Sequence, residues 1–391
     1  MRILLTLSLL AMSALAQSTA PQTAPKTEAT QTAAPKTAGP QKLPESLTAA
    51  ECARLSRELS EEGGYFRSDN FTSNETSYLH IVDKLKQLAQ KGGAYLGVGP
   101  EQNYTYIAKT RPQIVFLLDI RRQAIIQHLM YKAVFHHSPT RVEFLARLLS
   151  KPLPKEKPAA TLSLNETLAL VDKIPADEPT YTANLALIRK TIEDDFQFPL
   201  SAEDQKSLEY VYKSFRADGL SISYRMDSWQ GSWFPTLKEI LAETDLNGIQ
   251  TGFLATVDDF EFMRGMHRKN LIIPVVGNFG GKKAIAAIGE YLRQRNTTVT
   301  AFYLSNVEQY LFGDGIFGAF AENVRRLPLS DKSLFIRAVA GRMPHPARIN
   351  GHRLVTLMQS MKVFLDDYDK GLYGDYIALS MTNYIAAELP K

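Results

Sequence analysis

The stretch AYLGVGPEQNYTYIAKTRPQIVFLLDI, residues 94–120, decides the fold. It opens with a short apolar strand that enters a glycine turn at Gly97 and Gly99. It continues as a short helix over residues 103–110 and closes with a continuous apolar run over residues 113–120. Near-continuous apolar strands are typical of parallel sheets that helices cover on both faces. The succession of strand, helix and strand therefore predicts an α/β fold with a mostly parallel sheet.

The same alternation extends in both directions along the chain. Helical patterns occupy residues 48–62 and 76–90 before the stretch, and residues 122–136 and 140–149 after it. Later expected elements are a helix over 256–268, a strand over 271–277, a helix over 282–295, a strand over 298–305 and a helix near 354–365. We predict a doubly wound, mostly parallel, Rossmann-like sheet.

Residues from about 151 to 245 interrupt this alternation. Helical patterns near residues 163–173, 178–194 and 202–216 have no clear strand between them. We interpret this segment as a helical insertion within a single α/β domain, which spans residues 47–391.

The first residues have the features of an export signal. Arg2 gives a positive start, residues 3–15 are almost all apolar, and Ala14-Leu15-Ala16 has the small-x-small form of a signal-peptidase site. We expect residues 1–16 to be a cleaved signal peptide for export to the periplasm or outside the cell. The alternative, an uncleaved anchor, requires about 20 apolar residues, and no later segment is long and apolar enough to span a membrane. Residues 17–46 are rich in Ala, Pro and Thr without aromatic residues, which predicts a disordered tether.

Composition and residue types argue against several functions. The formal net charge is only +4, whereas a dedicated nucleic-acid binder has a strong basic excess. Cys52 is the only cysteine, so an intrachain disulfide cannot form. His136 and His137 are adjacent, so their side chains should splay apart, and the chain has no His-x-x-x-His pair or cysteine cluster. We therefore expect no metal site.

Polar and glycine residues gather where the predicted strands end. In an open parallel sheet, ligands bind beyond the carboxyl ends of the strands. The predicted cofactor-binding residues are Gly97, Gly99, Glu101, Asn103, Asp119, Gly277 and Asn278. A further predicted strand end is followed by Asn306 and Glu308. This clustering predicts a site for a small-molecule ligand.

The residues around the glycine turn indicate which ligand fits. Asp119 lies about 20 residues after the glycines, where an acid accepts hydrogen bonds from ribose hydroxyls. Its alternatives are a cap on the next helix or an ion pair with Arg121 or Arg122. A dinucleotide-binding turn requires a third glycine, but this chain has Gln102 there, and Glu101 would repel a diphosphate at the helix start. An adenosine ligand without phosphates, such as S-adenosylmethionine, fits better.

The chain resembles class I S-adenosylmethionine-dependent methyltransferases, and more closely a bacterial family of methyltransferase-like proteins with that fold. The segments that carry the resemblance are GYFRSDNFTSNE, YLGVGPEQNYTYIA, FLLDIRRQAIIQHLMYKA, NLIIPVVGNFGGKKA and VTAFYLSNVEQYLF, within residues 63–312. The resemblance implies that Gly97 and Gly99 contact the cofactor and that Asp119 binds its ribose. Asn306 and Glu308 occupy the strand end where methyltransferases acting on nitrogen hold the target atom, so they are the catalytic candidates.

This chain departs from the first methyltransferase motif, acid-x-Gly-x-Gly-x-Gly. Tyr95 replaces the acid and Glu101 replaces the last glycine. Two hypotheses therefore stay open: an exported S-adenosylmethionine-dependent methyltransferase whose acceptor is unknown, or a non-catalytic exported binding protein that retains the fold. A nicotinamide oxidoreductase is a third, weakened by the absent third glycine. The polar segment 68–75 before the first sheet strand is either a lid over the cofactor or a capping turn.

Overall fold

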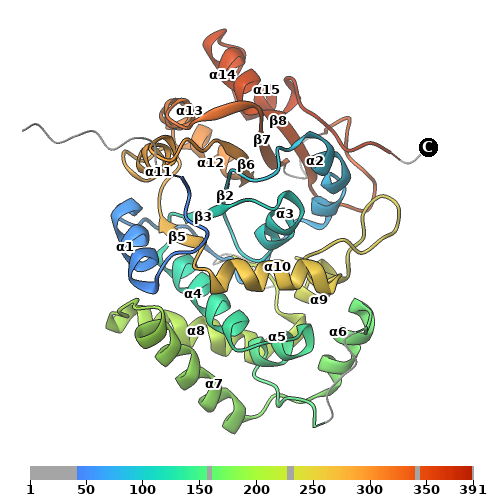
Figure 1. The fold of residues 1–391 in the computed structure, drawn as a ribbon. Helices are drawn as coiled ribbons and strands as arrows, with labels where there is room; N and C mark the ends of the chain where they lie inside the picture. Colours follow the sequence, from blue (N-terminus) through green and yellow to red (C-terminus); the bar gives the residue numbers. More distant parts are fainter. Residues whose placement is uncertain (1–41, 156–160, 227–232, 340–343, 390–391) are drawn as a thin grey trace, which may run out of the picture. The chain divides into compact units, whose positions relative to one another are not determined.

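A six-stranded sheet forms the centre of the fold (Figure 1). Its strands are β2 (Ala94–Gly97), β3 (Ile114–Asp119), β5 (Ile272–Val276), β6 (Val299–Ser305), β7 (Leu329–Val339) and β8 (Val355–Ser360). The order is β5-β3-β2-β6-β7-β8, with parallel pairing up to β7 and antiparallel pairing between β7 and β8. The predicted α/β fold with a mostly parallel sheet is confirmed, and it is compatible with a Rossmann-like fold.

The computed structural model describes residues 42–155, 161–226, 233–339 and 344–389. Contacts group Pro40–Lys391 into one compact unit. The predicted signal peptide, residues 1–16, and the predicted tether up to residue 41 lie outside the described residues.

Burial on both faces explains why the first strands are continuous apolar runs. Every residue of β2, β3 and β5 is buried, as in parallel sheets with two covered faces. Pro274 lies within β5, and the sheet tolerates it because β5 is an edge strand where a missing N–H costs little. The Pro274 carbonyl oxygen accepts a hydrogen bond from Ser56 Oγ at 2.6 Å, which attaches helix α1 (Ala49–Leu59) to this edge.

Helices cover both faces of the sheet (Figure 1). One layer contains α3 (Gln102–Thr110), α4 (Arg122–His136) and α10 (Val257–Arg268). The other contains α1, α11 (Ala284–Arg293), α13 (Phe317–Arg325) and α14 (Met361–Asp369). In the parallel part of the sheet, each crossover passes through one of these layers, as parallel strands require.

A second group of helices packs outside α4. It comprises α5 (Arg141–Leu148), α6 (Leu164–Lys173), α7 (Glu178–Lys190), a π-helical turn (Thr191–Asp195), α8 (Ala202–Asp218), a 3₁₀ turn (Gly219–Ser221) and α9 (Leu237–Ala242). Helices α5, α7 and α8 contact α4 directly. In this group, α6 to α9 occupy the segment predicted as a helical insertion, and its short strand β4 (Arg225–Met226) pairs with β1 (Ser68–Asp69). Among the described residues, no helix combines the length and apolarity needed to cross a membrane.

The helix predicted over residues 76–90 is wrong in detail. The chain forms a 3₁₀ turn (Thr76–Leu79) and a separate helix α2 (Val82–Leu88). Glu75 occupies the N-cap position of the 3₁₀ turn but makes no side-chain capping bond. Its carboxylate is buried among polar groups instead, so tertiary contacts overrode the local capping pattern.

The predicted helix near residues 354–365 is also wrong in its first half. Residues 355–360 form strand β8, and α14 begins only at Met361. Strand β7 was not predicted from the sequence. The rest of this region forms the helices α12 (Val307–Gly313), α13 and α15 (Tyr376–Met381). All of β8 except Ser360 is buried, so its sequence lacks the alternation that marks a half-exposed strand.

Candidate functional site

The strand order reverses between β2 and β6, next to the glycine turn. β2 continues along the chain to β3 and β5 on one side, while β6 begins the other half of the sheet. The carboxyl ends of these parallel strands lie at the same edge of the sheet, which is where ligands bind in open α/β folds. Gly99, Asp119 and Asn306 therefore lie near this reversal point, as the sequence predicts. We call this edge the strand-end site.

The side chain of Asn103 holds the glycine turn in shape. Its Nδ2 donates to the carbonyl oxygens of Val98, Gly99 and Pro100 at 2.8–2.9 Å. Its Oδ1 accepts a hydrogen bond from the Tyr95 hydroxyl at 2.9 Å, and the side chain is fully buried. Asn103 therefore positions the turn rather than facing a ligand, which the sequence pattern alone does not distinguish.

The turn requires glycine at its two positions for different physical reasons. A Cβ on Gly97 would lie 1.9 Å from Asn103 Oδ1, so the packing of Asn103 excludes any side chain there. Gly99 has φ +77°, and no heavy atom of the described residues lies within 4 Å of the position where its Cβ would be. The backbone at Gly99 is therefore the part of the turn that a ligand can approach.

The carboxylate of Asp119 pairs with Arg121, which is one of the sequence-level alternatives. Its Oδ1 accepts from the Arg121 backbone N–H at 2.9 Å and from Nε at 3.0 Å, and its Oδ2 accepts from Nη2 at 2.9 Å. Arg121 Nη1 also donates to the Ser68 carbonyl oxygen at 2.7 Å. A carboxylate has about four acceptor positions. Arg121 takes three of them, and the fourth, on Oδ2, receives no hydrogen bond from the described residues, with 5% of the side chain exposed.

The polar segment 68–75 crosses the strand-end site. Ser68 meets Arg121 as above, and the Ser73 backbone N–H donates to Glu101 Oε1 at 2.9 Å. Gln127 of α4 donates to the Phe71 carbonyl oxygen at 2.9 Å. These contacts bind the segment to the ends of β2 and β3, which is the position that a lid over this site needs.

Two carboxylates lie buried below this segment. Glu101 is 2% exposed, and its Oε2 has no hydrogen-bond partner among the described residues. Burial raises the pKa of Glu101 to about 7. Glu75 accepts hydrogen bonds from Gln102 Nε2 at 2.9 Å and from Ser305 Oγ at the end of β6, and burial raises its pKa too. Glu101 therefore faces the protein interior rather than a ligand.

Glu308 is not available at the strand-end site. Its Oε2 lies 2.8 Å from Nε of Arg337, and both side chains are fully buried. Arg337 Nη1 also donates to Gln359 Oε1 at 2.7 Å. The structure thus corrects the catalytic role predicted for Glu308, because this ion pair joins α12 to β7. Asn306 is half-buried at the start of α12, and its Oδ1 accepts a weak hydrogen bond from Ser305 Oγ at 3.4 Å.

The turn after β5 is filled by a carboxylate of the chain itself. Glu61 accepts hydrogen bonds from the backbone N–H groups of Asn278 at 2.8 Å and Lys283 at 2.9 Å. A Cβ on Gly277 would lie 2.6 Å from the Cβ of Ala284. Gly277 and Asn278 therefore serve the junction with the end of α1, and Glu61 occupies the anion position at the start of α11. No motif in the sequence indicates this role for Glu61.

Two cavities and one grouping of metal-ligating side chains among the described residues lie elsewhere. A cavity of about 500 Å³ is lined by residues that include Lys213, Arg216 and Ser221, and one of about 180 Å³ lies beside α1. Among the described residues, one set of three potential metal ligands comes together, on α4 and the π-helical turn.

Comparison with known proteins gives one family. A family model described as a domain of unknown function (DUF7790) matches residues 70–374. No curated protein matches the chain.

Proposed function

The chain belongs to the DUF7790 family, and on that premise we propose that it is a methyltransferase-like protein that binds S-adenosylmethionine at the strand-end site. One observation carries the proposal. The space beside the Cα of Gly99 is open at the point where the strand order reverses, whereas Asn103 binds the carbonyl oxygens of Val98, Gly99 and Pro100. A cofactor approaches the sheet at this point in open α/β folds.

The strand order is compatible with the methyltransferase variant of this fold. The five parallel strands follow the order of a doubly wound nucleotide-binding sheet, with β2 at its centre. Strand β8 then runs antiparallel at the β7 edge, an arrangement that occurs in many doubly wound folds.

Asp119 supports recognition of a ribose through one hydroxyl group. Its free acceptor position on Oδ2 takes a hydroxyl hydrogen bond while Arg121 stays in place. Displacing Arg121 would instead leave a buried charge without its partner, at a cost of about 3–5 kcal/mol. We therefore propose that the adenosine binds beside the Asp119–Arg121 pair without separating it.

An acidic side chain near a helix start supports a ligand without phosphates. Glu61 already occupies the N–H groups at the start of α11. A diphosphate would meet this carboxylate there. This favours S-adenosylmethionine over a nicotinamide dinucleotide.

A second candidate is a non-catalytic binding protein with the same ligand site. The buried Glu308–Arg337 pair favours it, because it removes one of the two catalytic candidates from the surface. Asn306 is then the candidate for contact with a methyl acceptor. In either case we propose an exported protein, on the basis of the sequence of residues 1–16.

Calorimetric titration of the full-length protein with S-adenosylmethionine and S-adenosylhomocysteine tests the proposal. We expect micromolar binding, about −8 kcal/mol. Gly99→Ala should weaken it at least about tenfold because the new methyl group occupies the open approach. This variant should still fold, since the left-handed backbone costs an alanine only about 1–2 kcal/mol.

Two further variants complete this titration. Asp119→Ala should also lose binding, whereas Asp258→Ala, an exposed acid on α10, should bind like the parent chain. Absence of binding at millimolar ligand would overturn the cofactor proposal. Saturable binding of reduced nicotinamide dinucleotide instead would revive the oxidoreductase alternative.

A further inference from the structure

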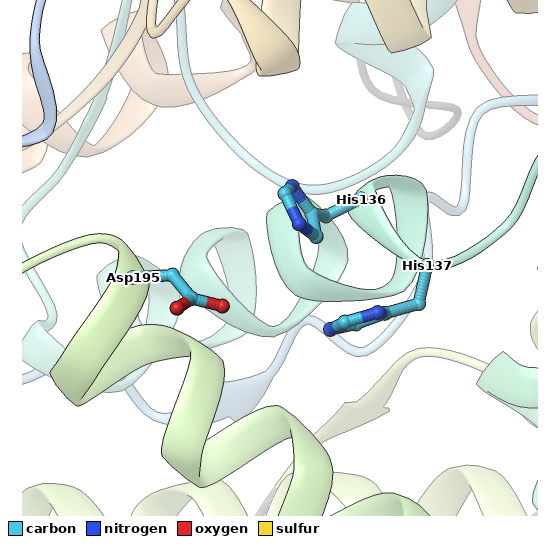
Figure 2. Close-up of side chains that lie close together, drawn as sticks. All are labelled: His136, His137 and Asp195. Atoms are coloured by element: carbon cyan, nitrogen blue, oxygen red, sulfur yellow. The ribbon is translucent and has the colours of Figure 1, made fainter.

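We propose that His136, His137 and Asp195 form a binding site for a divalent transition-metal ion of the Zn²⁺ type. One ligand atom from each of the three side chains lies within 4.8 Å of the other two. Figure 2 shows the three side chains gathered between the end of α4 and the helical segment that carries Asp195. This site is separate from the strand-end site and does not depend on the function proposed there.

Two adjacent histidines converge at the end of α4. His136 is the last residue of the helix, and His137 is its C-cap, with φ −92° and ψ 3°. Their ring centroids lie 4.8 Å apart, so the expectation that the two side chains splay apart is wrong.

The third ligand comes from a turn of rare geometry. Residues Thr191–Asp195 form a π-helical turn directly after α7, and the Phe196 N–H donates to the Thr191 carbonyl oxygen at 2.9 Å, five residues back. Single π turns inside or at the end of α-helices occur frequently at functional sites. Asp195 is the last residue of this turn and faces the two histidines (Figure 2).

The ligand set has the chemistry of a zinc site. Imidazole nitrogen and carboxylate oxygen bind Zn²⁺ at about 2.0–2.2 Å, so tetrahedral ligand atoms lie roughly 3.5 Å apart. His136 and Asp195 are exposed and can rotate to close the remaining distance. Three protein ligands leave the fourth position for water, the arrangement of open zinc sites.

A hydroxyl group orients one of the histidines. His137 Nε2 and Thr191 Oγ1 are 2.7 Å apart. Metal-ligating histidines almost always use their other ring nitrogen for such a hydrogen bond, which fixes the tautomer and the ring orientation. The π-helical turn therefore supplies both the ligand Asp195 and the outer partner Thr191.

The surrounding charges set the metal affinity that we expect. Lys132, Arg264 and Arg268 lie near His136, and Arg147 lies near His137, whereas Asp195 is an acid near both. The positive charges weaken the binding of a dication, and the carboxylate of Asp195 favours it. We expect one ion per chain at moderate affinity.

The test is a titration of untagged, chelator-treated, full-length protein with Zn²⁺ and with Co²⁺. Calorimetry counts the ions, and the visible absorption of Co²⁺ reports a tetrahedral site with nitrogen and oxygen ligands. His136→Ala and Asp195→Asn should each lower the affinity at least about tenfold, and both residues are exposed, so the fold should persist. Thr191→Val should lower it about tenfold through the ring of His137.

His352→Ala is the matched control. His352 belongs to the other pair of neighbouring histidines, with its ring centroid 4.4 Å from that of His80. This variant should bind the ion as the parent chain does. The proposal is overturned if the parent chain takes up no saturable single equivalent of Zn²⁺, or if His136→Ala and Asp195→Asn leave the affinity unchanged.

Discussion

At the scale of single residues, the partner of each polar side chain decides whether it can meet a ligand. Asp119 keeps one acceptor position because Arg121 binds both carboxylate oxygens but not every lone pair. Glu101 was predicted beside the cofactor, but its side chain is buried with one oxygen unpaired. Two acids at neighbouring strand ends are thus almost equally buried but differ in their partners, since Asp119 pairs with Arg121 and one oxygen of Glu101 is unpaired.

Glu101 should make stability fall as the pH rises. Its folded pKa of about 7 exceeds the ordinary value of 4.5, so the folded state holds a proton that the unfolded state has lost. The free energy of unfolding should therefore decrease between about pH 4.5 and 7, by about 3 kcal/mol from this group. Glu101→Gln should remove this part of the slope and be more stable than the parent above pH 7.

Urea denaturation across pH 4–8 measures this effect. Glu62→Gln changes an exposed acid and should keep the slope of the parent chain. Parallel profiles for the parent chain and Glu101→Gln would show that the pKa of Glu101 is the same in the folded and unfolded states.

At the scale of elements, a buried ion pair joins a helix and a strand whose local sequences give no sign that they are in contact. Glu308 at the start of α12 and Arg337 in β7 form an ion pair with no exposed surface. Strand β7 is one of the elements that the sequence did not predict, because an arginine interrupts its apolar run. The charge is tolerated there only because α12 and β8 supply Glu308 and Gln359 as partners.

Removing one partner of this pair should be costly. Glu308→Leu or Arg337→Met alone should lower the free energy of unfolding by about 3–5 kcal/mol, because the remaining group stays buried without its partner. The double variant Glu308→Leu with Arg337→Met should cost clearly less than the sum. Guanidinium denaturation of the four proteins measures the coupling. If Glu308 served catalysis rather than stability, its single variant would instead keep the free energy of unfolding of the parent chain.

At the scale of the whole molecule, α4 connects the sheet to the outer helices. Twelve of its 15 residues are buried, since β3 and β5 lie on one side and α5, α7 and α8 on others. A helix that is apolar on all sides is typical of such a buried position. The start of α4 lies beside Asp119 and its end carries His136, so one rigid element reaches both proposed sites.

Ligand binding at the strand-end site should therefore stabilise the folded chain as a whole. At a concentration of S-adenosylmethionine 100 times its dissociation constant, the free energy of unfolding should rise by about 2.7 kcal/mol. Thermal unfolding with and without ligand measures the rise, and Gly99→Ala, with binding at least about tenfold weaker, should show about 1.4 kcal/mol or less at the same concentration. An equal rise in that variant would place the ligand away from the open glycine turn.

Much of the fold was predictable from local patterns. The apolar runs of β2, β3, β5 and β6 and the helix of residues 122–136 lie where the sequence places them, within one or two residues. Strands β7 and β8 escaped prediction because polar or charged residues interrupt their apolar runs, and partners such as Arg337 and Gln359 are distant in sequence.

The sequence by itself determined the α/β class, the glycine turn and the position of acids at strand ends. These features depend on apolar periodicity and on backbone geometry, which act over a few residues. Only the tertiary structure decided which of those acids are free, and it brought His136, His137 and Asp195 together. Side-chain pairing depends on contacts between segments tens of residues apart, such as Glu61 with Asn278, and no local pattern encodes them.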